Sequence, residues 1–113
     1  RRRREPGFDW AIIRLAGVGE ISRLVLDTAH FKGNYPYECS VYGTLYTGGN
    51  EQSIAAQSLY WQELLPPQRM AADKEFTFVE QLKKIGLVSH LRLNMYPDGG
   101  VSRIRAFGQL RMQ

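Results

Sequence analysis

A ten-residue stretch in the first third of the chain gathers four side chains that could bind a small polar molecule. Asp27 and His30 supply a carboxylate and an imidazole, and Lys32 and Asn34 add an ammonium and a carboxamide where a strand is expected to pass into a loop. Loops attached to a rigid sheet are where proteins usually display binding groups. The alternative is a solvated polar loop in which Asp27 and Asn34 only stabilise turns. The residue types alone support these two interpretations about equally.

A second candidate begins with the sequence Pro97-Asp98-Gly99-Gly100, which is typical of a hairpin turn between two strands. Arg103 and Arg105 would share one face of the strand that follows. Across the hairpin, His90 and Arg92 would then lie about 5 Å away. Like charges this close repel each other, so the cluster could bind a small carboxylate. The alternative is a salt-bridge network with acidic residues of the chain itself: Glu38, Asp27 or Asp98.

The excess positive charge lies at the N-terminus. The chain has 15 Lys and Arg against 11 Asp and Glu, and residues 1–4 are all arginine, so the remainder is balanced. A nucleic-acid-binding protein usually spreads positive charge over a face or a groove. We therefore expect no nucleic-acid partner. The arginines precede Phe8 and Trp10 and could instead pack along the edge of a sheet.

No standard catalytic signature is present in the sequence. It contains no G-x-S-x-G, H-E-x-x-H or P-loop, and its single cysteine, Cys39, excludes a thiolate zinc site. The sequence assigns no cofactor. Its two histidines, His30 and His90, are too few for a three-histidine metal site, but a mixed site that combines histidine with Asp27, Asp98 or Glu38 stays open. Cys39 cannot form an intramolecular disulfide, which favours a reducing, cytoplasmic location. No apolar run approaches the roughly 18 residues of a membrane span and no secretory signal is recognisable, so we expect no membrane partner.

The elements that must position these groups are strands, because apolar and polar residues alternate with a period of two. The pattern predicts seven short strands, at residues 10–15, 21–28, 39–46, 59–65, 76–79, 88–96 and 101–107. Gly17-Val18-Gly19 is expected to be a turn after the first strand, and Pro66-Pro67 to end the fourth. Residues 51–58 could form a helix or a loop, and residues 80–85 a helical turn closed by Gly86. With 113 residues, the chain is predicted to be one all-β domain, a β-sandwich or jelly roll.

Taken in order, these segments resemble the allantoicase family, amidine hydrolases of purine degradation. The resemblance covers essentially the whole chain and is most specific in three motifs: residues 2–10 (with Arg2, Arg3, Pro6, Gly7, Asp9 and Trp10), residues 27–36 and residues 90–105. It implies a jelly-roll, galactose-binding-like fold and the hydrolysis of allantoate to ureidoglycolate and urea. Family members usually carry a histidine where this chain has Phe8, so this chain departs from the family at that position.

The family is built from two such jelly rolls in tandem. Residues 1–113 are therefore expected to be one repeat that lacks its N-terminal beginning and could be inactive by itself. The partners implied are the small-molecule substrate allantoate, the second jelly-roll repeat, and further copies of the enzyme in a homo-oligomer. The alternative is a non-catalytic ligand-binding or structural jelly-roll module, since a fold does not determine a function.

Hydrolysis of allantoate requires one group that protonates the leaving nitrogen and one that deprotonates water. His30 is the first candidate for proton transfer because the ordinary pKa of histidine lies near neutrality. Asp98 is the second catalytic candidate and could also contact a ureido group. The substrate-binding candidates are cations for the carboxylate and an amide for the ureido groups: Lys32, Arg103, Arg105 and Asn34. These roles require the loops at 29–37 and 97–100 to meet at one rim of the sheets.

Overall fold

In the part of the chain that the structure describes, the alternating pattern corresponds to six β-strands, and one short helical segment accompanies them. A computed structural model describes residues 9–46 and 51–111 of the chain. The elements in chain order are β1 (Asp9–Asp27), β2 (Glu38–Thr44), α1 (Glu51–Gln57), the 3-10 helix η1 (Ser58–Tyr60), β3 (Gln62–Arg69), β4 (Glu75–Phe78), β5 (Leu87–Tyr96) and β6 (Arg103–Leu110). The predicted all-β character is confirmed, and residues 51–57 form a helix. In the described ranges, no helix has the length and apolar character needed to cross a membrane.

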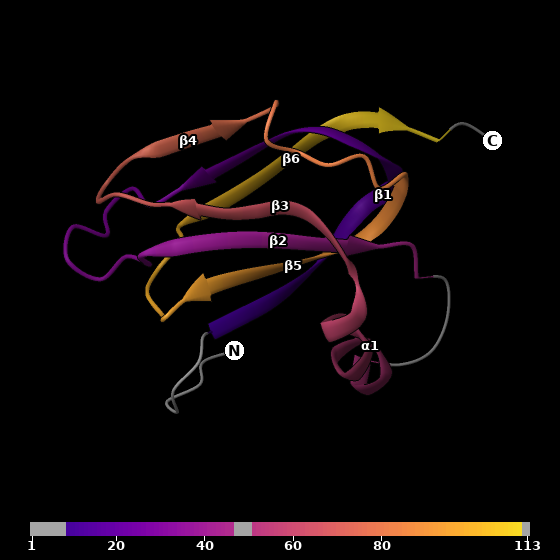
Figure 1. The fold of residues 1–113 in the computed structure, drawn as a ribbon, viewed down its shortest axis with the longest axis horizontal. Coiled ribbons are helices and arrows are strands. Elements are labelled where there is room, and N and C mark those ends of the chain that lie inside the picture. Colours follow the sequence, from indigo (N-terminus) through magenta and orange to yellow (C-terminus); the bar gives the residue numbers. More distant parts are fainter. Residues whose placement is uncertain (1–8, 47–50, 112–113) are drawn as a thin grey trace.

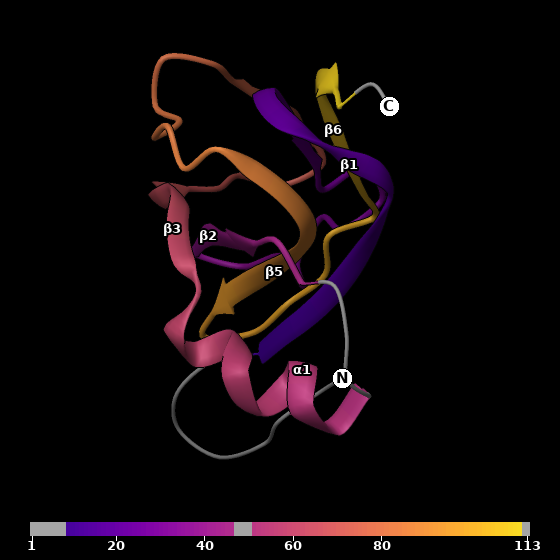
Figure 2. The ribbon, with the colours of Figure 1, turned by 90° about the vertical axis from the view of Figure 1, so that its right-hand side faces the viewer.

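The strands form one curled antiparallel sheet in which β1 is shared by two groups of strands. The strand order is β3-β2-β5-β1-β4, and β6 also pairs with β1. The first part of β1, from Asp9 to Arg14, pairs with β5, whereas its last part, from Leu24 to Asp27, pairs with both β4 and β6. Figures 1 and 2 show β1 curving along its length between these groups. The curl turns one face of the sheet inward and creates an interior.

This interior is filled by apolar side chains from both groups of strands. Leu24 and Leu26 of β1 belong to one buried cluster with Val41 of β2 and with Leu91 and Leu93 of β5, and none of the five is more than 4% exposed. Burial of each such side chain stabilises the fold by about 1.5–3 kcal/mol. The core therefore holds the two groups of strands together and places the strand ends that carry the loops.

The prediction of a turn at Gly17-Val18-Gly19 is wrong, because these residues lie inside β1. The register between β1 and β5 shifts between Arg14 and Gly19, which marks the irregularity in the strand. A Cβ on Gly19 would lie 2.6 Å from the backbone carbonyl oxygen of Gln109 in β6. Glycine is thus required here for the close approach of a neighbouring strand, as is common for glycine within strands.

Pro66 and Pro67 do not end their strand, contrary to the prediction. β3 continues through both residues to Arg69 and lies at an edge of the sheet, paired with β2. The register between β2 and β3 shifts between Cys39 and Val41, opposite the prolines. An edge strand with a local irregularity tolerates proline because the missing N–H groups break few ladder hydrogen bonds.

Two further local predictions are also wrong. Residues 80–85 form no helical turn closed by Gly86; a tight turn, in which the N–H of Leu82 donates to the carbonyl of Val79, leads into irregular chain. The strands β5 and β6 do not form a hairpin, since β5 pairs with β1 and β2 and β6 pairs with β1. The connection at residues 97–102 instead carries the chain from one group of strands to the other.

Candidate functional site

The two polar segments singled out in the sequence lie side by side at one end of the sheet, at the left of Figure 1. The N–H of Gly100 donates to the carbonyl of Asn34 at 2.8 Å, and the N–H of Tyr37 donates to the carbonyl of Tyr96 at 2.8 Å. The N–H of Ser102 donates to the carbonyl of Asp27, again at 2.8 Å. The β1–β2 and β5–β6 connections are therefore joined along their length.

Close packing between these connections explains the glycine pair. Gly99 has a φ of 122°. A Cβ on Gly99 would lie 2.5 Å from the backbone nitrogen of Pro36, and one on Gly100 would overlap the ring of Phe31 at 2.3 Å. The sequence predicted these glycines as hairpin residues. In the structure they allow one loop to pack against the other.

A third loop, which the sequence analysis missed, completes this end of the molecule. It is the β3–β4 connection at residues 70–74, and it is fastened to the β1–β2 connection by Thr28, whose hydroxyl donates to the carbonyl of Ala71 at 2.6 Å. The same hydroxyl accepts from the N–H of Lys74 at 3.1 Å, and the N–H of His30 donates to the Asp73 carboxylate at 2.8 Å. We call the three connections together, residues 28–37, 70–74 and 97–102, the rim.

The rim brings together four of the six predicted site residues. His30, Lys32 and Asn34 are exposed on the β1–β2 connection, and Asp98 is half-buried on the β5–β6 connection. His30 has a φ of 74°, in the left-handed region that residues other than glycine rarely adopt. An imidazole, an ammonium, a carboxamide and a carboxylate are thus offered on adjoining segments, a combination that can bind a small anion and transfer a proton.

The two predicted arginines lie on β6, beside the rim. Arg103 is the first residue of this strand and is paired with Asp27, the last residue of β1. Arg105 follows two residues later and forms an ion pair with Glu75 of β4. Both arginines are exposed. Arg103 therefore adjoins the rim directly, while the guanidinium of Arg105 is shared with an acidic neighbour.

The predicted cluster of Arg103 and Arg105 with His90 and Arg92 does not form. His90 and Arg92 lie on β5 opposite the first part of β1, whereas the two β6 arginines lie opposite its last part. The cluster depended on the β5–β6 hairpin, which is absent. Its two halves consequently belong to different groups of strands.

Arg92 instead occupies a buried polar network. Its Nε donates to Oδ1 of Asn94 at 2.9 Å and its Nη1 donates to the hydroxyl of Ser58 at 2.7 Å, while its guanidinium carbon lies 4.7 Å from the centre of a Trp10 ring. Arg92 is only 3% exposed. Through Ser58, this side chain ties η1 to the sheet, so the face of β5 that the pattern predicted to be polar is covered and structural.

The same network reaches the rim through Tyr96. Nδ2 of Asn94 donates to the hydroxyl of Ser40 at 3.1 Å, and that hydroxyl is hydrogen-bonded to the hydroxyl of Tyr96, also at 3.1 Å. Tyr96 is the last residue of β5 and precedes the connection that carries Asp98. The buried network thus anchors one of the two strands from which the β5–β6 connection is suspended.

Burial perturbs two ionisable groups away from the rim. It raises the pKa of the Cys39 thiol to about 12, so this side chain is protonated and is no candidate nucleophile. It lowers the pKa of His90, and the positive charge of Arg14 lowers it further. Within the described part of the chain, no three His, Cys, Asp or Glu side chains gather to hold a metal ion.

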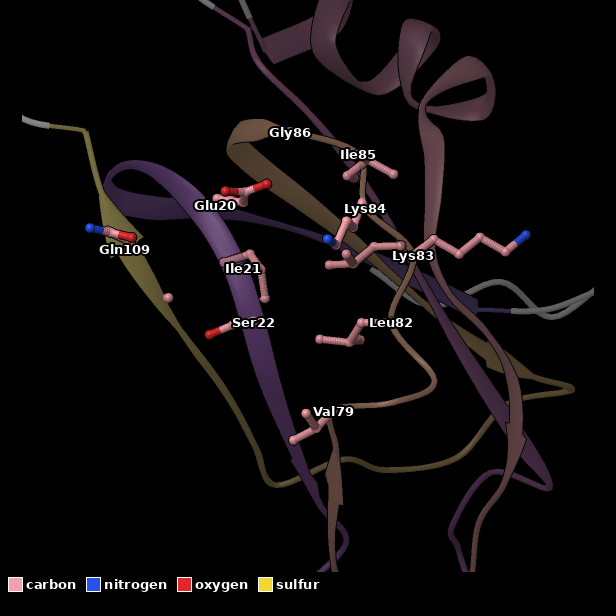
Figure 3. Close-up of a pocket in the computed structure, with 12 residues that line it drawn as sticks. Glu20, Ile21, Ser22, Val79, Leu82, Lys83, Lys84, Ile85, Gly86 and Gln109 are labelled. Atoms are coloured by element: carbon pink, nitrogen blue, oxygen red, sulfur yellow. The ribbon is translucent and has the colours of Figure 1, made fainter.

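A pocket of about 630 Å³ lies at the far ends of β5 and β6 from the rim (Figure 3). It is bordered by β1 on one side and by the β4–β5 connection on the other, with Ile21 and Leu82 on opposite walls. Exposed Lys84 adds a positive charge. The pocket contains none of the predicted site residues, so the candidate site is the rim.

Comparison with known proteins relates the whole chain to one family. The family profile described as "Allantoicase repeat" matches residues 1–111. A "Probable allantoicase" of Pseudomonas fluorescens is 51% identical over 110 residues, which cover 97% of this chain and 33% of that protein. Another, from Pseudomonas paraeruginosa, is 56% identical over 108 residues, covering 96% of this chain and 32% of that protein.

Solved structures give the same result. The allantoicase of Saccharomyces cerevisiae is 37% identical and superposes with a TM-score of 0.74, covering 96% of this chain and 30% of that one. A second solved structure, titled "Structure of allantoicase", matches with the same identity and TM-score and is covered to 31%. This chain spans about one third of the length of the relatives that it matches.

Proposed function

This chain belongs to the allantoicase family, and from this membership we propose that it is one repeat of an enzyme that hydrolyses allantoate to ureidoglycolate and urea in purine degradation. The observation that carries the proposal is the meeting of two family motifs, residues 27–36 and 90–105, at the rim. Segments this far apart in sequence are joined there by backbone hydrogen bonds and offer groups that suit a small carboxylate substrate.

The wider setting of this repeat is part of the same proposal. The curled sheet with its joined loops at one end supports a jelly-roll, galactose-binding-like fold. Relatives about three times as long support a second repeat as a partner within the same polypeptide. A buried, free Cys39 supports a cytoplasmic, reducing location, and we expect copies of the enzyme to form a homo-oligomer.

The proposed reaction breaks one C–N bond at the central carbon of allantoate and forms a C–O bond to water. Water must lose a proton as it attacks, and the leaving nitrogen must gain one to depart as urea. His30 is suited to proton transfer because histidine exchanges a proton readily near neutral pH. Asp98, on the adjoining connection, is the second group proposed to exchange a proton. The two residues lie on loops that Gly100 and Asn34 join directly.

Substrate binding is assigned to the cations and the amide at or beside the rim. Lys32 and Arg103 are proposed to pair with the carboxylate of allantoate. Arg105, which forms an ion pair with Glu75, is proposed as a further cation for that carboxylate. Asn34 is proposed to bind a ureido group, since its amide both donates and accepts hydrogen bonds. Arg105→Lys should raise KM because lysine lacks the planar fork of arginine; an unchanged KM would remove Arg105 from the binding role.

The test is urea release from allantoate by the full-length protein. We expect the unaltered protein to release urea. His30→Ala should lower turnover strongly while lowering thermal stability far less. Lys32→Ala should raise KM, and Lys84→Ala, a matched change of an exposed lysine beside the remote pocket, should leave it unaltered. Allantoate binding without urea release would instead establish a non-catalytic binding module. Neither binding nor release would establish a structural one.

A further inference from the structure

Two residues at the rim share an unusual backbone conformation and contact each other. Within residues 9–46 and 51–111, the non-glycine residues with positive φ are His30 at 74° and Asp73 at 49°. Only glycine adopts this region freely, and aspartate and histidine adopt it more often than most other residues, though still rarely. These two residues lie on different connections and are 43 positions apart in the sequence.

Asp73 is hydrogen-bonded to His30 and to the next residue of the same connection, Phe31. The N–H of His30 donates to Oδ1 of Asp73 at 2.8 Å, and the N–H of Asp73 donates to the carbonyl of Phe31 at 3.2 Å. The carboxylate thus binds the amide of the very residue whose conformation is unfavourable. Such a conformation persists only where surrounding contacts impose it, and it is frequent at functional sites.

Thr28 makes the position of Asp73 rigid from the buried side. Its side chain is fully buried and its hydroxyl bonds the backbone of Ala71 and Lys74, while its own N–H donates to the carbonyl of Lys74 at 2.9 Å. The β3–β4 connection is consequently fixed to the start of the β1–β2 connection on both sides of Asp73. His30 is then held by a carboxylate that cannot easily move away.

We propose that Asp73 is a positioning residue that holds His30 in the left-handed conformation required for proton transfer at the rim, an inference that rests on the proposed function. Without the bond to Asp73, His30 would relax toward the common φ of about −60°, a rotation of roughly 130° about its N–Cα bond. Such a rotation redirects the Cα–Cβ bond and carries the imidazole with it. Proton transfer requires the imidazole within hydrogen-bond reach of the substrate, so turnover should depend on this clamp.

The test is a double-mutant cycle in the full-length protein. Asp73→Gly removes the carboxylate while tolerating the positive φ at residue 73, and Asp73→Asn is the matched control, because it keeps an Oδ1 acceptor and also tolerates that φ. We expect Asp73→Gly to lower kcat about tenfold or more with little change in KM, and Asp73→Asn to keep most of kcat. In a His30→Ala background, Asp73→Gly should cause no further loss of kcat, because its whole effect passes through the imidazole.

An equal loss of kcat from Asp73→Gly in both backgrounds would overturn the inference, and so would full turnover by Asp73→Gly when His30→Ala is impaired. A fully active His30→Ala protein would refute the proposed role of His30 itself. That single variant therefore distinguishes a failure of the proposed function from a failure of the inference about Asp73. Amide hydrogen exchange gives a readout without activity. The His30 amide should exchange faster in Asp73→Gly, whereas the Met70 amide, which donates to the carbonyl of Tyr37 and lies outside the turn around His30, should not change. Unchanged exchange at His30 would also overturn the clamp.

Discussion

Replacing Gly99 by alanine tests whether the candidate site depends on the close approach of the two joined loops. Gly99 has a φ of 122°, which side chains of L-amino acids rarely allow. A Cβ there would lie 2.5 Å from both the backbone nitrogen of Pro36 and the carbonyl carbon of Tyr35. Both neighbours are backbone atoms, so no rotation of a side chain can relieve the overlap. The β1–β2 and β5–β6 connections must therefore move apart.

Two costs combine in this variant. The unfavourable backbone conformation costs about 1–3 kcal/mol, and overpacking against a fixed neighbour costs about 1–3 kcal/mol. We therefore expect Gly99→Ala to lower the free energy of unfolding by about 2–6 kcal/mol. For a domain of this size, each kcal/mol shifts Tm by about 4 °C or more, so Tm should fall by at least about 8 °C. Urea denaturation followed by tryptophan fluorescence measures the free energy, and calorimetry measures Tm.

Gly33→Ala is the matched control within the same pair of loops. A Cβ on Gly33 would meet no heavy atom within 4 Å, and its φ lies outside the strained range. We expect this variant to stay within about 0.5 kcal/mol of the unaltered protein. Equal stability of Gly99→Ala and Gly33→Ala would show that the loops are not in tight contact, and the rim would lose its structural basis.

Three further predictions concern buried groups. Burial lowers the pKa of His90 in the folded state, so below about pH 6.5 the unfolded chain takes up a proton that the folded chain does not. The free energy of unfolding should therefore fall as the pH drops below that value. The denaturation midpoint of His90→Gln should fall less over the same pH range. Arg92→Met should lower the free energy of unfolding by about 1–3 kcal/mol, because Asn94 and Ser58 each lose a donated hydrogen bond; a denaturation midpoint equal to that of the unaltered protein would contradict this. Cys39 is fully buried with a pKa of about 12, so iodoacetamide at about pH 8 should label it only after unfolding, and rapid labelling of the folded chain by mass spectrometry would disprove its burial.

The local predictions held where side-chain alternation decides the outcome. The strands expected at 39–46, 76–79 and 88–96 correspond to β2, β4 and β5, because alternation fixes both the extended conformation and the division of residues between two faces. Alternation failed at Gly17-Val18-Gly19 and at Pro66-Pro67. Glycine and proline are common in turns, yet within a curled sheet the same residues permit close approach or occupy an edge.

The pairing of strands could not be predicted from this pattern. A period of two contains no information about the neighbouring strand, so β5 and β6 were expected to pair directly. In fact each pairs with β1, β5 mainly with its first part and β6 with its residues from Gly19 to Asp27. That one error placed Arg92 beside Arg103 in an exposed cluster. In the structure, Arg92 is buried under η1, and Arg103 stands at the start of an exposed strand.

The amino-acid sequence by itself determined the all-β character, the family and the chemical groups of the two motif segments, because these depend on residue types and their spacing. The tertiary structure alone decided which of these groups meet. Leu24 and Leu26 of β1 pack into the core, β1 pairs with β5, β4 and β6, and the curled sheet brings three loops to one rim. The curled sheet also brings Asp73 to His30, 43 residues apart in the sequence. No local sequence pattern predicts this contact, because a hydrogen bond between distant segments forms only once the sheet has closed around its core.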